Sequence, residues 1–360
     1  MTILICLIAL ILVFKSVLFV IPTQSHLRGR TERIMCIFIY FVLIFLAAFR
    51  GEFVGADTSD YIGDYDRIAL FSFSDITDAY EDYFGFYYLM KLCTLMKFPL
   101  WAFFGLIELL YLTAIGRFIA KYSSDKLYSI LLFIILLFNF SLAGIKQVLA
   151  MTLTLHAYLE ITDKRLISAL LLGVAAFFVH PVSLVFVFAY LLFFYRNTRF
   201  YPFIIITVLL LFVVSPIRLF TMLLMFMGNE HFEMYLDLDK SYSAKTLVFY
   251  LLMMAISIPF VLQYLRKSEK TGLAKVELGC LAVVCVFQYL SSISPSLFRL
   301  SLFYVPFFLS YIPNVYGTNP GMLQKWGKTL TMIGAIVFYL YANRNFVYSF
   351  SWQFENFLNF

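Results

Sequence analysis

The sequence predicts an all-α, polytopic integral membrane protein with about twelve transmembrane helices. Hydrophobic residues make up 62% of the 360 residues, and charged residues make up only 13%. Mean hydropathy is +0.89. Ordinary soluble domains contain about 25% charged residues, so these values exclude both a soluble globule and a disordered chain. The apolar residues fall into runs near the length of a membrane helix, separated by short basic connections.

The apolar runs are interpreted in chain order as membrane spans of a single transmembrane domain over residues 1–360. The first run, Ile3–Ile21, is read as a span because it lacks the basic start and small-residue cleavage site of a signal peptide. The other predicted spans are Arg33–Phe49, Pro99–Ala120, Leu127–Ala143, Lys146–Ile161, Leu166–Val179, Val182–Tyr195, Tyr201–Ser215, Thr246–Leu265, Val276–Leu290, Leu297–Tyr311 and Thr329–Tyr341.

Basic residues orient these spans, because loops rich in Lys and Arg stay in the cytoplasm. The basic connections are Arg28/Arg30/Arg33, Lys121/Lys126, Lys164/Arg165, Arg196/Arg199, Arg266/Lys267/Lys270/Lys275 and Lys325/Lys328. All of them reach the cytoplasmic side only if Phe84–Phe98 does not cross the membrane. That segment is short and contains Lys91 and Lys97, so we interpret it as an interfacial or re-entrant piece. Both termini are then predicted to lie outside.

Two long loops are predicted on the outer side, at residues 50–83 and 216–245. The first holds nine of the 21 acidic residues of the chain. The topology also brings four groups of polar residues to the outer ends of spans. These groups are Arg50 to Tyr61, Lys146 with Gln147, His180 with Ser183, and Arg299 with Tyr304. A charge near the membrane interior is costly unless it is paired or lines a wet cavity, so the four groups predict one outward-facing polar cavity.

The same four groups contain motifs that resemble those of the EpsG/Wzy-type bacterial polysaccharide polymerases. In that family an Arg at a helix end is followed by Gly, Asp-Thr and Tyr, and a later helix starts with Arg-Gln-x-x-Ala. Lys146 stands here where Arg is usual. The matching stretches are FRGEFVGADTSDY from Phe49, IKQVLA from Ile145, FFVHPVSLV from Phe177, RLSLFYVP from Arg299 and, less closely, EDYFGFYYLMKL from Glu81.

The resemblance implies a fold similar to that of GT-C glycosyltransferases and a reaction at the outer face of the bacterial inner membrane. Oligosaccharide repeat units linked to undecaprenyl diphosphate are joined there into O-antigen or exopolysaccharide. The implied partners are this lipid-linked oligosaccharide, the lipid bilayer, a chain-length regulator and a flippase. No nucleic acid, cofactor or metal is expected, and Asp57/Asp60 is only a weak metal motif. The chain has no glycine-rich phosphate loop and no dinucleotide fingerprint, which argues against an ATP-driven pump and against an enzyme that takes nucleotide sugars through such a fold.

Each motif residue suits a step of that reaction. Cations offset the charge that builds on a leaving diphosphate, and Asp or His accepts the proton of an attacking hydroxyl. The candidates are Asp57, His180 and Arg299 for catalysis, Arg50, Lys146 and Arg299 for the diphosphate, and Tyr61, Gln147 and Tyr304 for sugars. The choice of base between Asp57 and His180 stays open.

Simpler readings and two rival functions also stay open at this point. Arg50, Lys146 and Arg299 are also typical of residues that anchor helix ends at the membrane interface. Asp57 is also typical of a turn, and His180 is also typical of a helix break before Pro181. A flippase for the same lipid-linked units would place its charges near the membrane midplane, and Glu108 and His156 are the residues that favour it. Otherwise we interpret these two as buried hydrogen-bonding partners outside the site. A ligase that moves finished polymer onto a lipid core would use the same donor.

Overall fold

The structure, a computed structural model, is helical throughout the residues that it describes, which are 2–22, 26–203, 205–207, 245–267, 271–291, 297–317 and 321–350. Its only other regular feature in those ranges is an isolated bridge between Arg50 and Phe350. The all-α prediction is therefore confirmed for this part of the chain. The chain divides into two compact units, which are described separately. Unit 1 is Met1–Ser183 with Tyr339–Phe360, and unit 2 is Leu184–Phe338.

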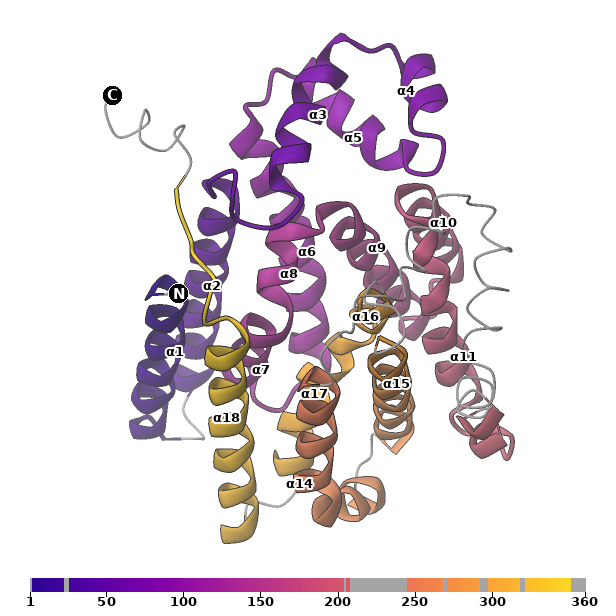
Figure 1. Cartoon of the computed structure of the whole chain (residues 1–360). Coiled ribbons are helices and arrows are strands. Elements are labelled where there is room, and N and C mark those ends of the chain that lie inside the picture. Colours follow the sequence, from indigo (N-terminus) through magenta and orange to yellow (C-terminus); the bar gives the residue numbers. More distant parts are fainter. Residues whose placement is uncertain are drawn as a thin grey trace. The chain divides into compact units, whose positions relative to one another are not determined.

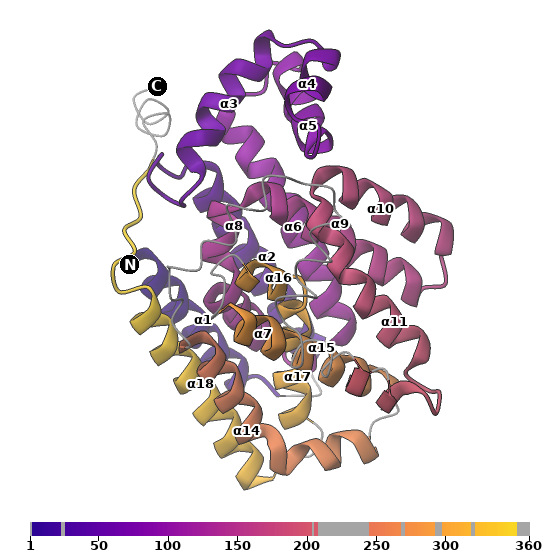
Figure 2. The same cartoon turned by 45° about the vertical axis from the view of Figure 1, so that its right-hand side comes forward.

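Unit 1 contains long apolar helices and a group of shorter ones. Helix α9 packs against α10 and α6, and α6 packs against α2; α9 and α10 lie side by side in both Figure 1 and Figure 2. The elements are α1 Thr2–Val20, α2 His26–Ala48, α3 Thr58–Leu70, α4 Phe73–Ala79, α5 Phe84–Leu95, α6 Leu100–Tyr122, α7 Lys126–Phe133, a π-helix η1 Ile134–Phe138, α8 Asn139–Ala143, α9 Ile145–Thr162 and α10 Leu166–Val179. The 3₁₀ helix η2, Pro181–Phe186, follows at the boundary of the two units.

Unit 2 is built around a buried carboxylate. Glu277 on α15 accepts hydrogen bonds from Tyr264 Oη at 2.5 Å, Ser310 Oγ at 2.5 Å and Asn314 Nδ2 at 3.2 Å. These donors offset the cost of burying the acid. The helices are α11 Val187–Tyr195, α14 Lys245–Lys267, α15 Thr271–Leu290, α16 Phe298–Ser301, α17 Val305–Gly317 and α18 Met322–Ala342, of which the last crosses into unit 1 at Tyr339.

Five helical segments are long and apolar enough to cross a membrane: His26–Ala48, Leu100–Tyr122, Lys126–Ala143, Lys245–Arg266 and Gly272–Leu290. Three shorter apolar helices cover Ile5–Val20, Leu166–Val179 and Pro181–Tyr195. The number of about twelve spans, the single transmembrane domain and the likeness to GT-C enzymes stay predictions. The predicted loop 216–245 and residues 208–215 of the span before it lie outside the described residues, apart from Lys245.

The structure corrects the predicted span Leu297–Tyr311. It is divided into α16 and α17, which are separated by a turn at residues 302–304. Pro306 is the second residue of α17. Proline lacks a backbone N–H and is best tolerated in the first turn of a helix, so it favours a new helix start at this point over a continuous span.

The segment 50–83, predicted as a loop, contains the helices α3 and α4. Ser72 and Asp75 form a capping box at the start of α4, which satisfies backbone N–H groups there. Helices α3, α4 and α5 lie together at one end of unit 1 (Figure 1), and α5 packs on α3, α4 and α10. With 12 residues, α5 is about 18 Å long, so its length agrees with the prediction that Phe84–Phe98 does not cross a membrane.

Candidate functional site

Arg50 is held rigidly just beyond the end of α2. Its side chain is buried, with 2% of its surface exposed. Its Nε donates a hydrogen bond to Thr58 Oγ1 at 3.3 Å, and Nη1 donates to the carbonyl of Ala47 at 2.9 Å. Thr58 in turn donates to the Val54 carbonyl at 2.6 Å. The loop from Arg50 to Thr58 therefore folds back on itself and fixes the guanidinium.

Two side chains of α6 face this guanidinium. The Phe104 ring centroid lies 3.8 Å from Cζ of Arg50, which is a cation–π contact. Glu108, one helical turn further on, attracts Arg50 electrostatically. Burial lowers the pKa of Arg50 to about 10, and the attraction of Glu108 opposes that shift, so the guanidinium stays charged at neutral pH. Sequence analysis had left Glu108 out of the site.

The protein leaves part of the guanidinium unused. Within the described ranges, Nη2 of Arg50 and Oε1 of Glu108 are buried atoms without a hydrogen-bond partner. Arg50 also lines a cavity of about 540 Å³, here called the Arg50 pocket, together with Asp66, Phe98 and Phe104 among others. An unsatisfied buried donor is costly. An anion that reached Nη2 from this pocket would satisfy it.

Ser349 and Phe350, at the end of the C-terminal segment of residues 343–350, line one side of the Arg50 pocket. The Gly51 N–H donates to the Ser349 carbonyl at 2.8 Å, beside the bridge between Arg50 and Phe350. Tyr348 Oη donates to the Leu46 carbonyl at 2.5 Å. Nothing in the local sequence of this segment signals the pairing, because its partners are about 300 residues away. Sequence analysis assigned it no role.

Lys146 lies in a cage of tyrosines at the first turn of α9. Its Nζ is 5.6 Å from the ring centroid of Tyr61, 4.9 Å from that of Tyr83 and 5.3 Å from that of Tyr87. It also donates a hydrogen bond to Tyr87 Oη at 3.3 Å. The N-terminus of a helix favours negative charge, so the ammonium and the start of α9 together make this point attractive to an anion.

Asp64 continues this network, and the sequence analysis assigned it no role. Only 15% of its side chain is exposed. It accepts hydrogen bonds from Tyr87 at 2.8 Å and Tyr80 at 3.2 Å. Burial and the Asp64 carboxylate raise the pKa of Tyr87 well above its usual value, so Tyr87 stays a donor. Once residues 58–70 are known to be helical, the three-residue spacing of Tyr61 and Asp64 indicates a shared face.

Replacing Tyr87 with phenylalanine is expected to lower activity about tenfold, because the loss of one hydroxyl removes hydrogen bonds that orient both Lys146 and Asp64. The measurement is the initial rate of glycan-product formation by purified protein. Tyr88→Phe is the matched control, since Tyr88 bonds only to Thr77 among the described residues, with its Oη at 2.6 Å from Thr77 Oγ1. Equal rates for both variants would remove the Lys146–Tyr87–Asp64 network from the site.

His180 adjoins this cage at the end of α10. Pro181 excludes the helical conformation from the preceding residue, and His180 accordingly caps α10 in an extended conformation with φ −160° and ψ 107°. Its ring centroid is 5.1 Å from that of Tyr83, at 75°. A Cβ at Gly85 would lie 2.8 Å from the Phe178 carbonyl, so only glycine permits α5 to approach α10 this closely.

The Arg50 and Lys146 clusters are linked through α3 and the end of α8. Helix α3 supplies Thr58 to Arg50 and Tyr61 to Lys146. Gly55 has a φ of +92°, and a Cβ there would lie 2.4 Å from the Leu142 carbonyl. The Arg50 loop therefore packs directly on the residues that precede Lys146, and a larger side chain than glycine is excluded at this contact.

The other candidate residues are placed as follows. Asp57 occupies the N-cap position of α3 without making a capping hydrogen bond and is partly exposed. Gln147 is buried with its amide 4.0 Å from Met151 Sδ. In unit 2, Arg299 lies half-exposed on α16, and the buried Tyr304 donates its hydroxyl to the Val185 carbonyl. Their proposed roles stay predictions, as does the assembly of Arg299 with the residues of unit 1.

The last feature of the site is its capacity to bind a metal ion. In the described ranges, no three His, Cys, Asp or Glu side chains are grouped as metal ligands would be. The expectation of no metal and no cofactor stays a prediction.

Unit 1 thus combines apolar helices of membrane-spanning length with two cationic side chains, Arg50 and Lys146, that contact aromatic rings. These features define the class of helical membrane proteins with a polar site at the ends of their helices. The chain belongs to the EpsG family, whose model matches residues 33–358. The matched range includes every candidate site residue. Comparison with curated proteins and with solved structures gave no match.

Proposed function

We propose that this chain is a polysaccharide polymerase that joins lipid-diphosphate-linked oligosaccharide repeat units at the outer face of the bacterial inner membrane. The observation that carries the proposal is the juxtaposition of Arg50, Lys146 and His180 in one unit, on motifs of the EpsG family. Undecaprenyl diphosphate is the proposed carrier. The bilayer, a flippase that delivers the units and a chain-length regulator are the proposed partners.

The reaction forms one bond and breaks another at the anomeric carbon of the growing chain. A hydroxyl oxygen of the incoming unit bonds to that carbon, while the bond from the carbon to the diphosphate oxygen breaks. The hydroxyl proton passes to Asp57 or His180, and the diphosphate leaves with the electron pair. Arg50, Lys146 and Arg299 offset its charge. Arginine grips phosphate oxygens with paired hydrogen bonds, whereas lysine acts as a point charge.

Tyr61, Gln147 and Tyr304 are the proposed sugar contacts. Tyr61 is the best supported of the three, since its ring faces Lys146 and its helix also carries Thr58 and Asp64. The positions of Gln147 and Tyr304 favour a packing role in the conformation described, because both are buried.

A flippase is the rival function, and its two supporting residues have other partners. Glu108 attracts Arg50, and Arg117 bonds to both His156 Nδ1 and Glu160, each at 2.9 Å. A polymerase is favoured because His156 is bound by Arg117 and Glu108 acts electrostatically on Arg50, a residue of the proposed site. A ligase shares the donor chemistry and differs in its acceptor, which the experiment must therefore vary.

The test uses purified protein in liposomes with a lipid-diphosphate-linked repeat unit, with and without a lipid-core acceptor, and glycan products are separated on a gel. A ladder of products supports the polymerase. Movement of the unit across the bilayer without a ladder would make the flippase the leading function. Single transfer onto a lipid core, again without a ladder, would indicate the ligase.

In the same assay, Lys146→Gln is expected to lower the rate about 30-fold, because it removes a positive charge at the leaving diphosphate. Lys146→Arg should retain activity, since arginine is usual at this position in the motif. Lys325→Gln, at an exposed position, is the matched control. Full activity of Lys146→Gln would remove this charge from the proposed mechanism.

A further inference from the structure

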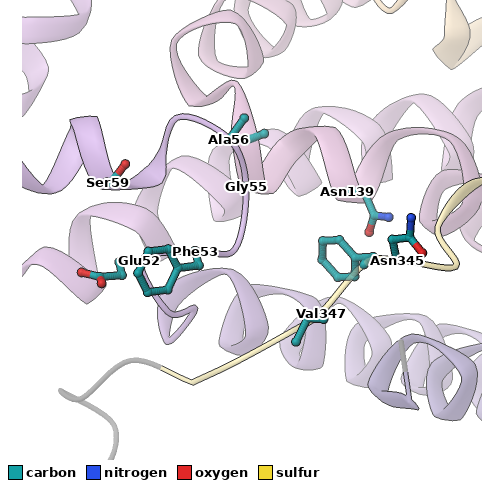
Figure 3. A pocket seen from close by; sticks show the side chains of 10 residues that line it. Glu52, Phe53, Gly55, Ala56, Ser59, Asn139, Asn345 and Val347 are labelled. Atoms are coloured by element: carbon teal, nitrogen blue, oxygen red, sulfur yellow. The ribbon is translucent and has the colours of Figure 1, made fainter.

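A second cavity, here called the Asn139 pocket, adjoins the Arg50 loop in unit 1. It measures about 530 Å³, within the size range of small-ligand sites. Its side chains come from the loop, α3, the start of α8 and the C-terminal segment (Figure 3). Those used below are Glu52, Phe53, Ser59, Asn139, Ala143 and Asn345.

The lining of the Asn139 pocket has the chemistry of a sugar site. Two amides, a hydroxyl and a carboxylate provide both donors and acceptors, which suits the many hydroxyls of a sugar. Figure 3 shows Asn139 and Asn345 toward one end and Glu52 and Ser59 toward the other. The Phe53 ring is 83% exposed and offers an apolar face for the C–H groups of a sugar ring. Among the described residues, no Lys or Arg lines the pocket, so the lining favours a neutral ligand over an anion.

Part of this lining is held in place by the protein, and part of it is left unused. Asn139 Nδ2 donates to Asn343 Oδ1 at 2.5 Å, and Tyr339 Oη donates to Asn139 Oδ1 at 3.4 Å. The C-terminal segment is itself fixed by the Gly51–Ser349 hydrogen bond. In contrast, none of the hydrogen bonds within the described residues uses the side chains of Asn345, Glu52 or Ser59. Fixed walls reduce the entropy lost on binding.

The Asn139 pocket shares a wall with the Arg50 pocket. Glu52 and Phe53 line both cavities. Ala143 also lines the Asn139 pocket and lies three residues before Lys146. A molecule with a diphosphate at one end and sugars at the other would therefore meet Arg50 in one space and amide, hydroxyl and carboxylate groups in the adjoining one.

We propose that the Asn139 pocket binds the sugar residues of the glycan whose diphosphate lies at Arg50. This inference rests on the proposed function, and it adds the place in unit 1 where the glycan binds. The C-terminal segment thereby becomes part of the substrate site, in which Asn345 contacts sugar hydroxyls.

The experiment measures sugar binding apart from catalysis. The probe is the lipid-free repeat oligosaccharide, released from the host's own polysaccharide by partial hydrolysis. It is titrated into purified full-length protein and followed by saturation-transfer NMR. The variants are Asn345→Ala and Ser59→Ala, both at exposed positions, and the matched control is Asn197→Ala, an exposed asparagine in unit 2.

We expect saturable binding to the wild type and to Asn197→Ala. Binding should be about tenfold weaker in Asn345→Ala and several-fold weaker in Ser59→Ala, because each loses a hydrogen bond to the sugar. Thermal unfolding of each variant reports whether it is folded. If Asn345→Ala does not fold, the binding measured for Ser59→Ala tests the inference in its place. No binding by the wild type, or wild-type affinity in the folded variants, would overturn the inference.

The product ladder separates this inference from the proposed function. A wild-type ladder with no pocket-dependent binding would refute the sugar site and leave the polymerase standing. Pocket-dependent binding without a ladder would refute the polymerase and leave the sugar site standing. If both are correct, Asn345→Ala should also yield shorter polymer.

Discussion

Arg50→Lys is expected to lower the rate of polymer formation at least about 100-fold. Lysine keeps the positive charge but cannot reproduce the planar fork that donates to Thr58 and Ala47 and stacks on Phe104. Hydrogen bonds to charged groups contribute about 1.5–3 kcal/mol each, and each 1.4 kcal/mol is a factor of ten. The measurement is the initial rate of ladder formation in liposomes at a fixed amount of lipid-linked unit.

The lysine variant is chosen over alanine for a physical reason. Alanine would remove the buried guanidinium together with its hydrogen bonds to Thr58 and Ala47, which would confuse lost catalysis with lost folding. Arg67→Lys is the matched control, because the Arg67 side chain is 60% exposed and lies 3.8 Å from Asp64. If Arg50→Lys polymerised as fast as this control, a generic charge would suffice and the two-point recognition of phosphate would be wrong.

Arg299→Ala is expected to abolish polymer, with a rate at least about 1,000-fold below that of the wild type. In the proposed mechanism its guanidinium offsets charge on the leaving diphosphate, and such groups contribute several kcal/mol to the transition state. Arg299 is only partly buried, so its removal should disturb the packing of unit 2 less than the removal of a core residue would. The same ladder assay reports the effect, and membrane fractionation reports insertion.

The controls for Arg299 separate charge from structure. Helix α16 is held to α15 by a hydrogen bond from Gln288 Nε2 to Ser301 Oγ at 2.7 Å, which does not involve the Arg299 side chain. Arg199→Ala removes an exposed arginine of the same unit and should leave activity unchanged. Long polymer at normal levels in Arg299→Ala would take this residue out of the site.

The helical architecture could be predicted from the sequence because each span is a local pattern. The predicted span Pro99–Ala120 differs by only one or two residues at each end from α6, Leu100–Tyr122, since a proline marks its start. The end of α10 at His180 could also be predicted from local sequence, because Pro181 disfavours the helical conformation at the residue before it. The break within Leu297–Tyr311 was missed, because composition alone reads an apolar run as continuous.

Part of the site could also be predicted, and part could not. Arg50, Lys146 and Tyr61 were found because they stand in recognisable motifs at the ends of helices. Glu108 and Asp64 were not, because a lone acid in a span or in an acidic stretch has the same local pattern whether it is paired or solvated. Their roles depend on which cation or phenol faces them in space.

The sequence by itself determined the all-helical class, the family and the identity of the cations, because hydropathy and motif order are properties of the chain read in one dimension. Only the tertiary structure decided that Lys146 lies among three tyrosines, that Glu108 attracts Arg50, and that Ser349 and Phe350 line the Arg50 pocket. The physical reason is that these contacts join residues 58 to about 300 positions apart. Such contacts form only when helices pack against one another, so they cannot be predicted from a local sequence pattern.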